Sequence, residues 1–97
     1  MEGVERMKTV TTQEVADYWR EGIPACNNGS NFWTDGSTIY SYRLIIGETT
    51  TDGEKLVQDY SANTRLGFKS MTTSKHVGYA RRYADLICDG VEIRRWR

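Results

Sequence analysis

The run Thr72-Thr73-Ser74-Lys75-His76 is the part of the sequence best suited to chemistry, because it combines three hydroxyls with a lysine and a histidine. The spacing of apolar residues predicts a helix that begins inside this run, over residues 74–87. The start of a helix presents unpaired backbone N–H groups and a positive dipole end, which attract anions. We therefore predict that Thr72, Thr73, Ser74, Lys75 and His76 bind a phosphate or a carboxylate. The alternative is that these hydroxyls only cap the helix.

His76 is the only histidine, so any acid–base reaction would have to use this one imidazole or a carboxylate. No phosphate-binding loop of the form G-x-x-x-x-G-K-S/T occurs in the chain. Asp35, Asp52 and Asp89 each precede a glycine, an arrangement typical of turns. We expect a non-enzymatic protein with no catalytic residue, no metal and no cofactor.

Aromatic and basic side chains form a second set of candidates. Trp33 lies beside a predicted turn, where its ring either covers the core or contacts a partner. Arg81 and Arg82 are neighbours on the second predicted helix and can contact the backbone of a nucleic acid. We include Trp33, Arg81 and Arg82 among the candidate binding residues. Simple solvation of the two arginines is the alternative.

Charge is balanced in total but uneven along the chain. The 13 basic residues equal the 13 acidic residues in number. Residues 1–64 nevertheless carry five basic and ten acidic residues, whereas residues 65–97 carry eight basic and three acidic residues. If folding keeps these portions apart, an acidic surface can imitate phosphates and a basic surface can bind them.

The composition indicates one small domain over residues 1–97, with residues 1–10 flexible, because the chain is too short for two cores. No apolar run approaches the roughly 18 residues of a membrane span, and the first residues lack a secretory signal. We expect a cytoplasmic protein that binds no membrane, and a homodimer stays open. Cys26 and Cys88 belong to no Cys-x-x-Cys pair, so free thiols are expected, although a disulfide between them also stays open.

The first predicted element is a helix over residues 12–21. Thr11 or Thr12 supplies a hydroxyl cap, and Glu14 completes the pattern of a capping box. Gly22 and Pro24 end the helix, because glycine accepts the left-handed cap and proline cannot continue the hydrogen-bond ladder. Residues 25–31 are predicted to be a loop.

Two hairpins follow, each marked by the tripeptide Thr-Asp-Gly, at residues 34–36 and 51–53. Three-residue loops with glycine in the left-handed conformation then connect the strands. Residues 38–46 become one continuous strand in this register. The predicted pairs are Trp33 with Ser37, Thr50 with Glu54 and Glu48 with Leu56, and the predicted apolar face carries Tyr40, Tyr42, Leu44 and Ile46.

Three further elements complete the prediction: a strand over residues 65–71, the second helix over residues 74–87 and a last strand over residues 91–96. The fold is therefore predicted to be α+β. A mostly antiparallel sheet of four to five strands is covered by two helices, in the order α-β-β-β-β-α-β.

Three short motifs occur in a defined order: Trp33-Thr34-Asp35-Gly36, Tyr40-Ser41-Tyr42 and Thr72-Thr73-Ser74-Lys75-His76. Together they resemble a family of short proteins from phages, prophages and other mobile elements of bacteria and archaea. The resemblance covers residues 31–77. It implies a small accessory protein inside a prokaryotic cell, in a setting where inhibitors of host or defence machinery are encoded, and it supplies no mechanism.

Two functions are therefore expected from the sequence. The first is an interaction protein of a phage or mobile element that inhibits a host or anti-phage defence protein by binding it. The alternative is a nucleic-acid or nucleotide-binding module that uses the helix start at residues 72–76 and the basic C-terminal third.

Overall fold

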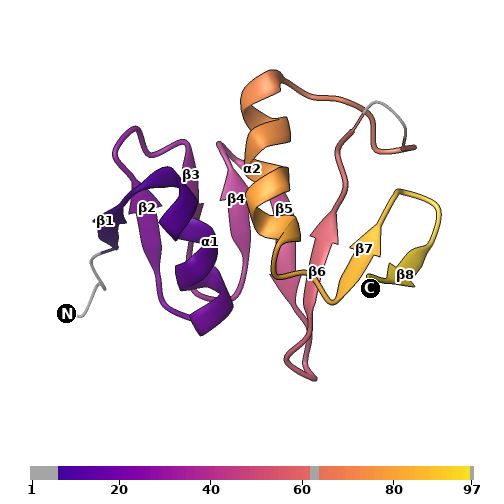
Figure 1. Cartoon of the computed structure of the whole chain (residues 1–97), viewed down its shortest axis with the longest axis horizontal. Helices are drawn as coiled ribbons and strands as arrows, with labels where there is room; N and C mark the ends of the chain where they lie inside the picture. The colour runs from indigo at the N-terminus through magenta and orange to yellow at the C-terminus, as the bar shows by residue number, and fades with distance from the viewer. Residues whose placement is uncertain (1–6, 62–63, 97) are drawn as a thin grey trace.

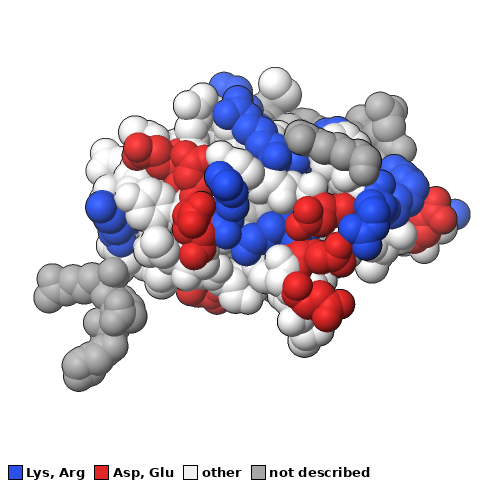
Figure 2. Space-filling view, turned by 60° about the horizontal axis from the view of Figure 1, so that its bottom comes forward, with Lys and Arg blue, Asp and Glu red and all other residues white. Residues whose placement is uncertain are grey.

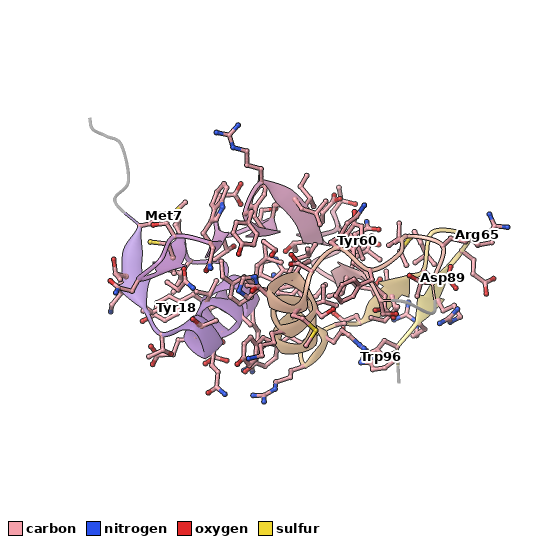
Figure 3. The ribbon with its side chains drawn as sticks, turned by 90° about the horizontal axis from the view of Figure 1, so that it is seen from above. Met7, Tyr18, Tyr60, Arg65, Asp89 and Trp96 are labelled. Atoms are coloured by element: carbon pink, nitrogen blue, oxygen red, sulfur yellow. The ribbon has the colours of Figure 1, made fainter. Side chains whose placement is uncertain are left out.

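The structure is a computed structural model that describes residues 7–61 and 64–96. Within them, one mixed sheet of eight strands carries helices α1 (Thr12–Glu21) and α2 (Met71–Arg81) on the same face (Figure 1). Seen from above, the helices form one layer and the sheet the other (Figure 3). The strands are β1 (Lys8–Val10), β2 (Ala25–Asn27), β3 (Phe32–Thr34), β4 (Ile39–Ser41), β5 (Leu44–Thr49), β6 (Lys55–Gln58), β7 (Leu86–Cys88) and β8 (Ile93–Arg95).

The order of the strands in the sheet follows their order in the sequence. β1 and β2 are parallel and are joined through α1, and β6 and β7 are parallel and are joined through α2. All neighbours from β2 to β6 are antiparallel, so β2 and β6 run in the same direction. Both helices consequently begin at one edge of the sheet, the edge where β1, β2 and β6 end.

The α+β class and the two helices are confirmed, but the predicted sheet is too small and the predicted order of elements is wrong. β1, β2 and β7 have three residues each, too few for an alternating pattern to be visible in the sequence. β1 falls within residues 1–10, which were predicted to be flexible, and residues 1–6 of that prediction lie outside the described residues. β2 falls within the predicted loop over residues 25–31.

Helix α1 has the predicted bounds. The Thr11 hydroxyl accepts a hydrogen bond from the Glu14 backbone N–H at 3.2 Å, and the Glu14 carboxylate accepts one from the Thr11 backbone N–H at 3.0 Å. Gly22 ends the helix at a φ of 79°. Local chemistry at both ends is sufficient to define this element.

Helix α2 begins and ends earlier than predicted, because the capping residue is Ser70. The Ser70 hydroxyl accepts a hydrogen bond from the Thr73 backbone N–H at 3.0 Å. Thr72 and Thr73 therefore lie inside the first turn of α2 rather than before the helix, and Ser74 follows them rather than starting the helix. The predicted strand over residues 65–71 is wrong, since a left-handed Gly67 (φ 79°) interrupts it and Met71 is already helical.

The second hairpin has the predicted register. The Thr50 backbone N–H donates to the Glu54 carbonyl at 2.8 Å, and Glu48 lies opposite Leu56.

The first hairpin differs from its prediction, because Trp33 pairs with Tyr40 rather than with Ser37. The Asp35 carboxylate accepts hydrogen bonds from the Ser37 and Thr38 backbone N–H groups, at 2.9 and 2.8 Å, and so stabilises a longer loop.

The predicted strand over residues 38–46 is broken by a tight turn at Tyr42-Arg43, so that Ser41 pairs with Leu44. The face predicted for Tyr40, Tyr42, Leu44 and Ile46 therefore does not exist as one surface. Ile39, Ser41 and Ile46 are buried under the helices, whereas Tyr40 is half-buried and Tyr42 is exposed.

The core lies between the helices and the sheet, and Trp19 is its largest side chain. The Trp19 Nε1–H donates to the Ser37 carbonyl at 2.9 Å. A Cβ atom added to Gly47 would lie 2.7 Å from Ile39 Cγ2 and 3.0 Å from Trp19 Cζ2, so only glycine allows α1 to pack this closely on β5. The buried cluster comprises Val15, Ala16, Trp19, Phe32, Ile39, Ile46, Val57, Val77, Ala80, Ala84 and Ile87.

Cys26 and Cys88 are free, half-buried thiols. Their strands, β2 and β7, are separated by four others in the sheet, which places them about 24 Å apart at the usual spacing of strands. A disulfide requires Cα atoms within about 7 Å of each other. The intramolecular disulfide that the sequence left open is therefore excluded.

Candidate functional site

A pocket of about 280 Å³ lies at the edge of the sheet where both helices begin. It brings together the first turns of α1 and α2 and the connection between β2 and β3, which are far apart in the sequence. The lining residues are Thr12, Asn27, Asn31, Thr72, Lys75, His76 and Tyr79.

Asn27 organises one wall of this pocket. Its side-chain oxygen accepts hydrogen bonds from the backbone N–H groups of Asn31 (3.1 Å) and Phe32 (3.2 Å), which fixes the other atom of the amide as the donor. That Nδ2 group donates to the Asn31 side-chain oxygen at 2.7 Å and to the Thr12 hydroxyl oxygen at 3.1 Å. The Asn31 Nδ2 group and the Thr12 O–H are thereby left as donors beside the pocket.

His76 forms the inner wall and is almost completely buried, with 2% of its surface exposed. Its ring stacks on Phe32, with centroids 4.2 Å apart and planes 2° from parallel. Its Nδ1 atom lies 2.8 Å from the Ser41 hydroxyl oxygen, which in turn lies 2.9 Å from the Thr73 hydroxyl oxygen.

The hydroxyls of Ser41 and Thr73 select one tautomer of His76. If Thr73 donates to Ser41 and Ser41 donates to Nδ1, every hydroxyl proton has an acceptor. If instead Nδ1–H donates to Ser41 and Ser41 donates to Thr73, the Thr73 hydroxyl proton has no acceptor among the described residues. We therefore assign the Nε2–H tautomer, with Nδ1 as the acceptor.

The Nε2–H group makes no hydrogen bond within the part of the chain that the structure describes, although His76 lines the pocket. Burial lowers the pKa of His76 from 6.5 to about 4, so the imidazole is neutral at physiological pH. His76 therefore offers the pocket an uncharged, unpaired donor.

All side chains that line the pocket are neutral or basic, and no carboxylate is among them. Lys75 contributes an exposed ammonium group, and the start of α2 contributes its dipole without an acidic residue in the first turn. Glu14 offsets part of the positive end of α1, so α2 is the more positive side. Such a pocket attracts an anion.

Ser41 and His76 have the spacing of a nucleophile and its base, but Ser41 is completely buried. A substrate cannot reach its hydroxyl without rearrangement of β4. The pair therefore positions the imidazole and does not present a nucleophile.

The structure brings together only some of the predicted site residues. Thr72, Lys75 and His76 line the pocket, whereas the buried Thr73 and the half-buried Ser74 do not. Arg81 lies over the Trp96 ring, 4.8 Å from its centroid, and Arg82 lies 5.7 Å from the centroid of Tyr79, so neither arginine lines the pocket.

Thr12, Asn27, Asn31 and Tyr79 are pocket residues that the sequence did not reveal. Asn27 and Asn31 fall in the predicted loop over residues 25–31. The signal in the sequence that could have indicated them is the recurrence of asparagine at residues 27, 28 and 31.

The two helices α1 and α2 cover one face of the sheet, and Trp33 lies on the other. Its ring stacks on Tyr40, its partner on β4, with centroids 3.9 Å apart. Cys26 pairs with Trp33, and Ile45 pairs with Tyr40, so these four residues form a row across the sheet. Both helices cover the other face (Figures 1 and 3), so Trp33 belongs to a separate surface that we call the outer row, made of Cys26, Trp33, Tyr40 and Ile45.

The acidic and basic portions of the chain do not form separate faces on the side visible in Figure 2, where acidic and basic side chains alternate. Ion pairs join the two portions: Arg95 lies 2.6 Å from Glu54, and Arg81 lies 4.0 Å from Asp59. The Asp17 carboxylate also accepts a hydrogen bond from the Tyr83 hydroxyl. Folding therefore interleaves the charges.

Two kinds of feature are absent from residues 7–61 and 64–96. No helix there is both long and apolar enough to cross a bilayer. No group of three or more histidine, cysteine, aspartate or glutamate side chains is arranged to hold a metal ion. In comparisons with known proteins, no family model, curated protein or solved structure matches this chain.

Proposed function

We propose that this protein is a small cytoplasmic binding module that holds a phosphate group in the pocket between its two helix starts. The observation that carries the proposal is the set of donors in the pocket. The His76 side chain is buried, and its Nε2–H has no hydrogen-bond partner among the described residues; the described residues that line the pocket include no carboxylate to repel an anion. A phosphate site agrees with the nucleotide-binding function that the sequence suggests as an alternative. The motif resemblance is the reason to propose a phage or other mobile element as the source of the protein.

Several features favour a phosphate over a carboxylate as the ligand. The donors come from different directions: Asn31 from the β2–β3 connection, Thr12 from α1, and Thr72 with Lys75 from α2. A tetrahedral anion with several acceptor oxygens satisfies such a set better than a planar group does. The volume, about 280 Å³, suits a phosphate with a small part of its carrier.

A titration with inorganic phosphate and pyrophosphate, followed by amide NMR at low salt, tests the proposal. We expect the largest shifts at Thr12, Asn31 and Thr72. Lys75→Ala should weaken binding about tenfold, the loss typical of one charge-assisted hydrogen bond. Lys69→Ala is the matched control, because it removes the same charge from an exposed lysine that lies over Tyr60 instead.

Two results would reject the phosphate site. One is the absence of any shift at millimolar phosphate or pyrophosphate. The other is an equal loss of affinity in both lysine variants, which would indicate nonspecific attraction to positive charge.

The outer row favours a second candidate function, the inhibition of a host or defence protein by binding. An aromatic pair beside Ile45, which is 40% exposed, forms an apolar strip on a sheet face that neither α1 nor α2 covers. The mixed charges speak against an acidic surface that imitates phosphates, so this candidate rests on apolar contact.

A photo-crosslinking residue placed at Ile45 in the prokaryotic host tests this second candidate. We expect one defined protein adduct from position 45, and we expect Tyr40→Glu to abolish it. A crosslinker at Asp52, in the exposed β5–β6 turn, is the control position. Identical adducts from both positions, or none from position 45, would argue against the outer row as an interface.

A further inference from the structure

Tyr42 has an unusual backbone conformation for a large side chain. It is the first residue of the tight turn between β4 and β5 and has a φ of 59°, a left-handed value that glycine or asparagine adopts at lower cost. Half of its surface is exposed to solvent. The exposed part of the side chain is available to a ligand, and backbone strain of this kind is often found at binding sites.

Two hydrogen bonds tie Tyr42 and its neighbour Ser41 to pocket residues, and a third joins Tyr42 to Trp33 on the other face of the sheet. The Tyr42 backbone N–H donates to the Asn31 carbonyl at 2.8 Å, and its carbonyl accepts from Trp33 Nε1–H at 2.8 Å. The preceding residue, Ser41, is bonded to His76. Since Asn31 and His76 both line the pocket, the position of Tyr42 relative to the pocket is fixed.

The ring of Tyr42 is the aromatic face available beside the pocket. One part of this ring packs against the inner wall of the pocket, because its centroid lies 6.4 Å from that of His76 with the planes tilted by 45°. The other two rings are less exposed: His76 is almost completely buried and stacks on Phe32, and the half-buried Tyr79 lies between Phe32 and Arg82.

We propose that the ligand is a nucleotide whose base stacks on Tyr42 while its phosphate occupies the pocket, an inference that rests on the proposed phosphate site. The polar pocket holds the charged end, and its small volume leaves the base outside, next to the exposed ring. Stacking on tyrosine tolerates every base, so we expect little preference among bases.

The experiment compares the affinities of inorganic phosphate, ribose 5-phosphate and AMP. In the wild type, AMP should bind roughly fivefold more tightly than ribose 5-phosphate, the lower end of what stacking on one aromatic ring contributes. Tyr42→Leu should remove this advantage and leave the affinity for ribose 5-phosphate unchanged, whereas Tyr42→Phe should keep it. Tyr18→Leu is the control, because Tyr18 lies on α1 outside the pocket.

Tyr42→Gly separates binding from folding. Glycine accepts the left-handed conformation, so this variant should be as stable as the wild type and should still lose the advantage of AMP. Equal affinities for AMP and ribose 5-phosphate in the wild type, or an advantage that persists in Tyr42→Leu, would overturn the role of Tyr42 and leave the phosphate site intact. If none of the three compounds binds, the phosphate site itself fails.

Discussion

The hydroxyl oxygen of Ser41 lies 2.8 Å from Nδ1 of His76, so a strand residue and a helix residue 35 positions apart form one buried hydrogen bond across the core. This contact occupies Nδ1 of the imidazole and leaves Nε2, on a side chain that lines the pocket, without a partner among the described residues. The tautomer of this pocket side chain therefore depends on Ser41, which is buried and does not line the pocket.

The tautomer of His76 can be tested directly. Nitrogen NMR at pH 7 should show a protonated Nε2 and an unprotonated Nδ1. In Ser41→Ala the two tautomers should mix, and phosphate affinity should fall about twofold if half of the molecules hold the competent form. Ser74→Ala, which removes a hydroxyl outside this contact, should change neither property. A protonated Nδ1 in the wild type would contradict the assignment.

Stability should depend on pH through His76. Its pKa is about 4 in the folded protein and 6.5 in the unfolded chain, so its contribution is complete above pH 6.5 and is lost as the pH falls toward 4. The free energy of unfolding should decrease by at most about 3 kcal/mol across this window. Urea titrations of the wild type and of His76→Gln measure the effect. Parallel curves for the two proteins would show that His76 is not held neutral.

Asn27→Ala should destabilise the protein by about 2–4 kcal/mol, because it leaves the backbone N–H groups of Asn31 and Phe32 without their acceptor. It should also weaken phosphate binding by releasing the β2–β3 wall. Asn28→Ala, at an exposed neighbouring position, is the control and should unfold near the wild-type urea concentration. Similar urea midpoints for the two variants would refute the structural role of Asn27.

Gly47→Ala should lower the free energy of unfolding by about 1–3 kcal/mol, because its Cβ would overlap Ile39 and crowd Trp19. Gly78→Ala is the opposite case, since Gly78 lies exposed in α2 with open space around it and alanine favours the helix by about 0.5–1 kcal/mol. Thermal unfolding of both variants should move in opposite directions. A stabilised Gly47→Ala would contradict the close approach of α1 to β5.

The two cysteines should remain thiols under mild oxidation. Mass spectrometry of the monomer should show no loss of two hydrogens, because β2 and β7 hold Cys26 and Cys88 too far apart for a bond. Any disulfide that forms should join two molecules, and it should not form when the protein is diluted before oxidation. An internal disulfide in a folded monomer would disprove the strand order.

Some predictions that depended on neighbours in the sequence agree with the structure, whereas the register of the first hairpin and the unbroken strand over residues 38–46 do not. Helix α1 has its predicted bounds because Thr11, Glu14 and Gly22 act within a few residues of the helix ends. The β5–β6 hairpin has its predicted register because its loop of residues 51–53 determines the pairing of Thr50 with Glu54. The start of α2 was displaced, since several hydroxyls between residues 70 and 74 are chemically able to cap a helix.

What the sequence by itself determined is the α+β class, the first helix and the cluster of Thr72, Lys75 and His76, because capping and turn chemistry act over a few residues. Only the tertiary structure decided the eight-stranded order, the separation of Trp33 from the pocket and the meeting of Thr12, Asn31 and His76. The physical reason is the parallel pairing of β1 with β2 and of β6 with β7. It brings both helix starts to one edge of the sheet, a relationship between distant segments that no local pattern encodes.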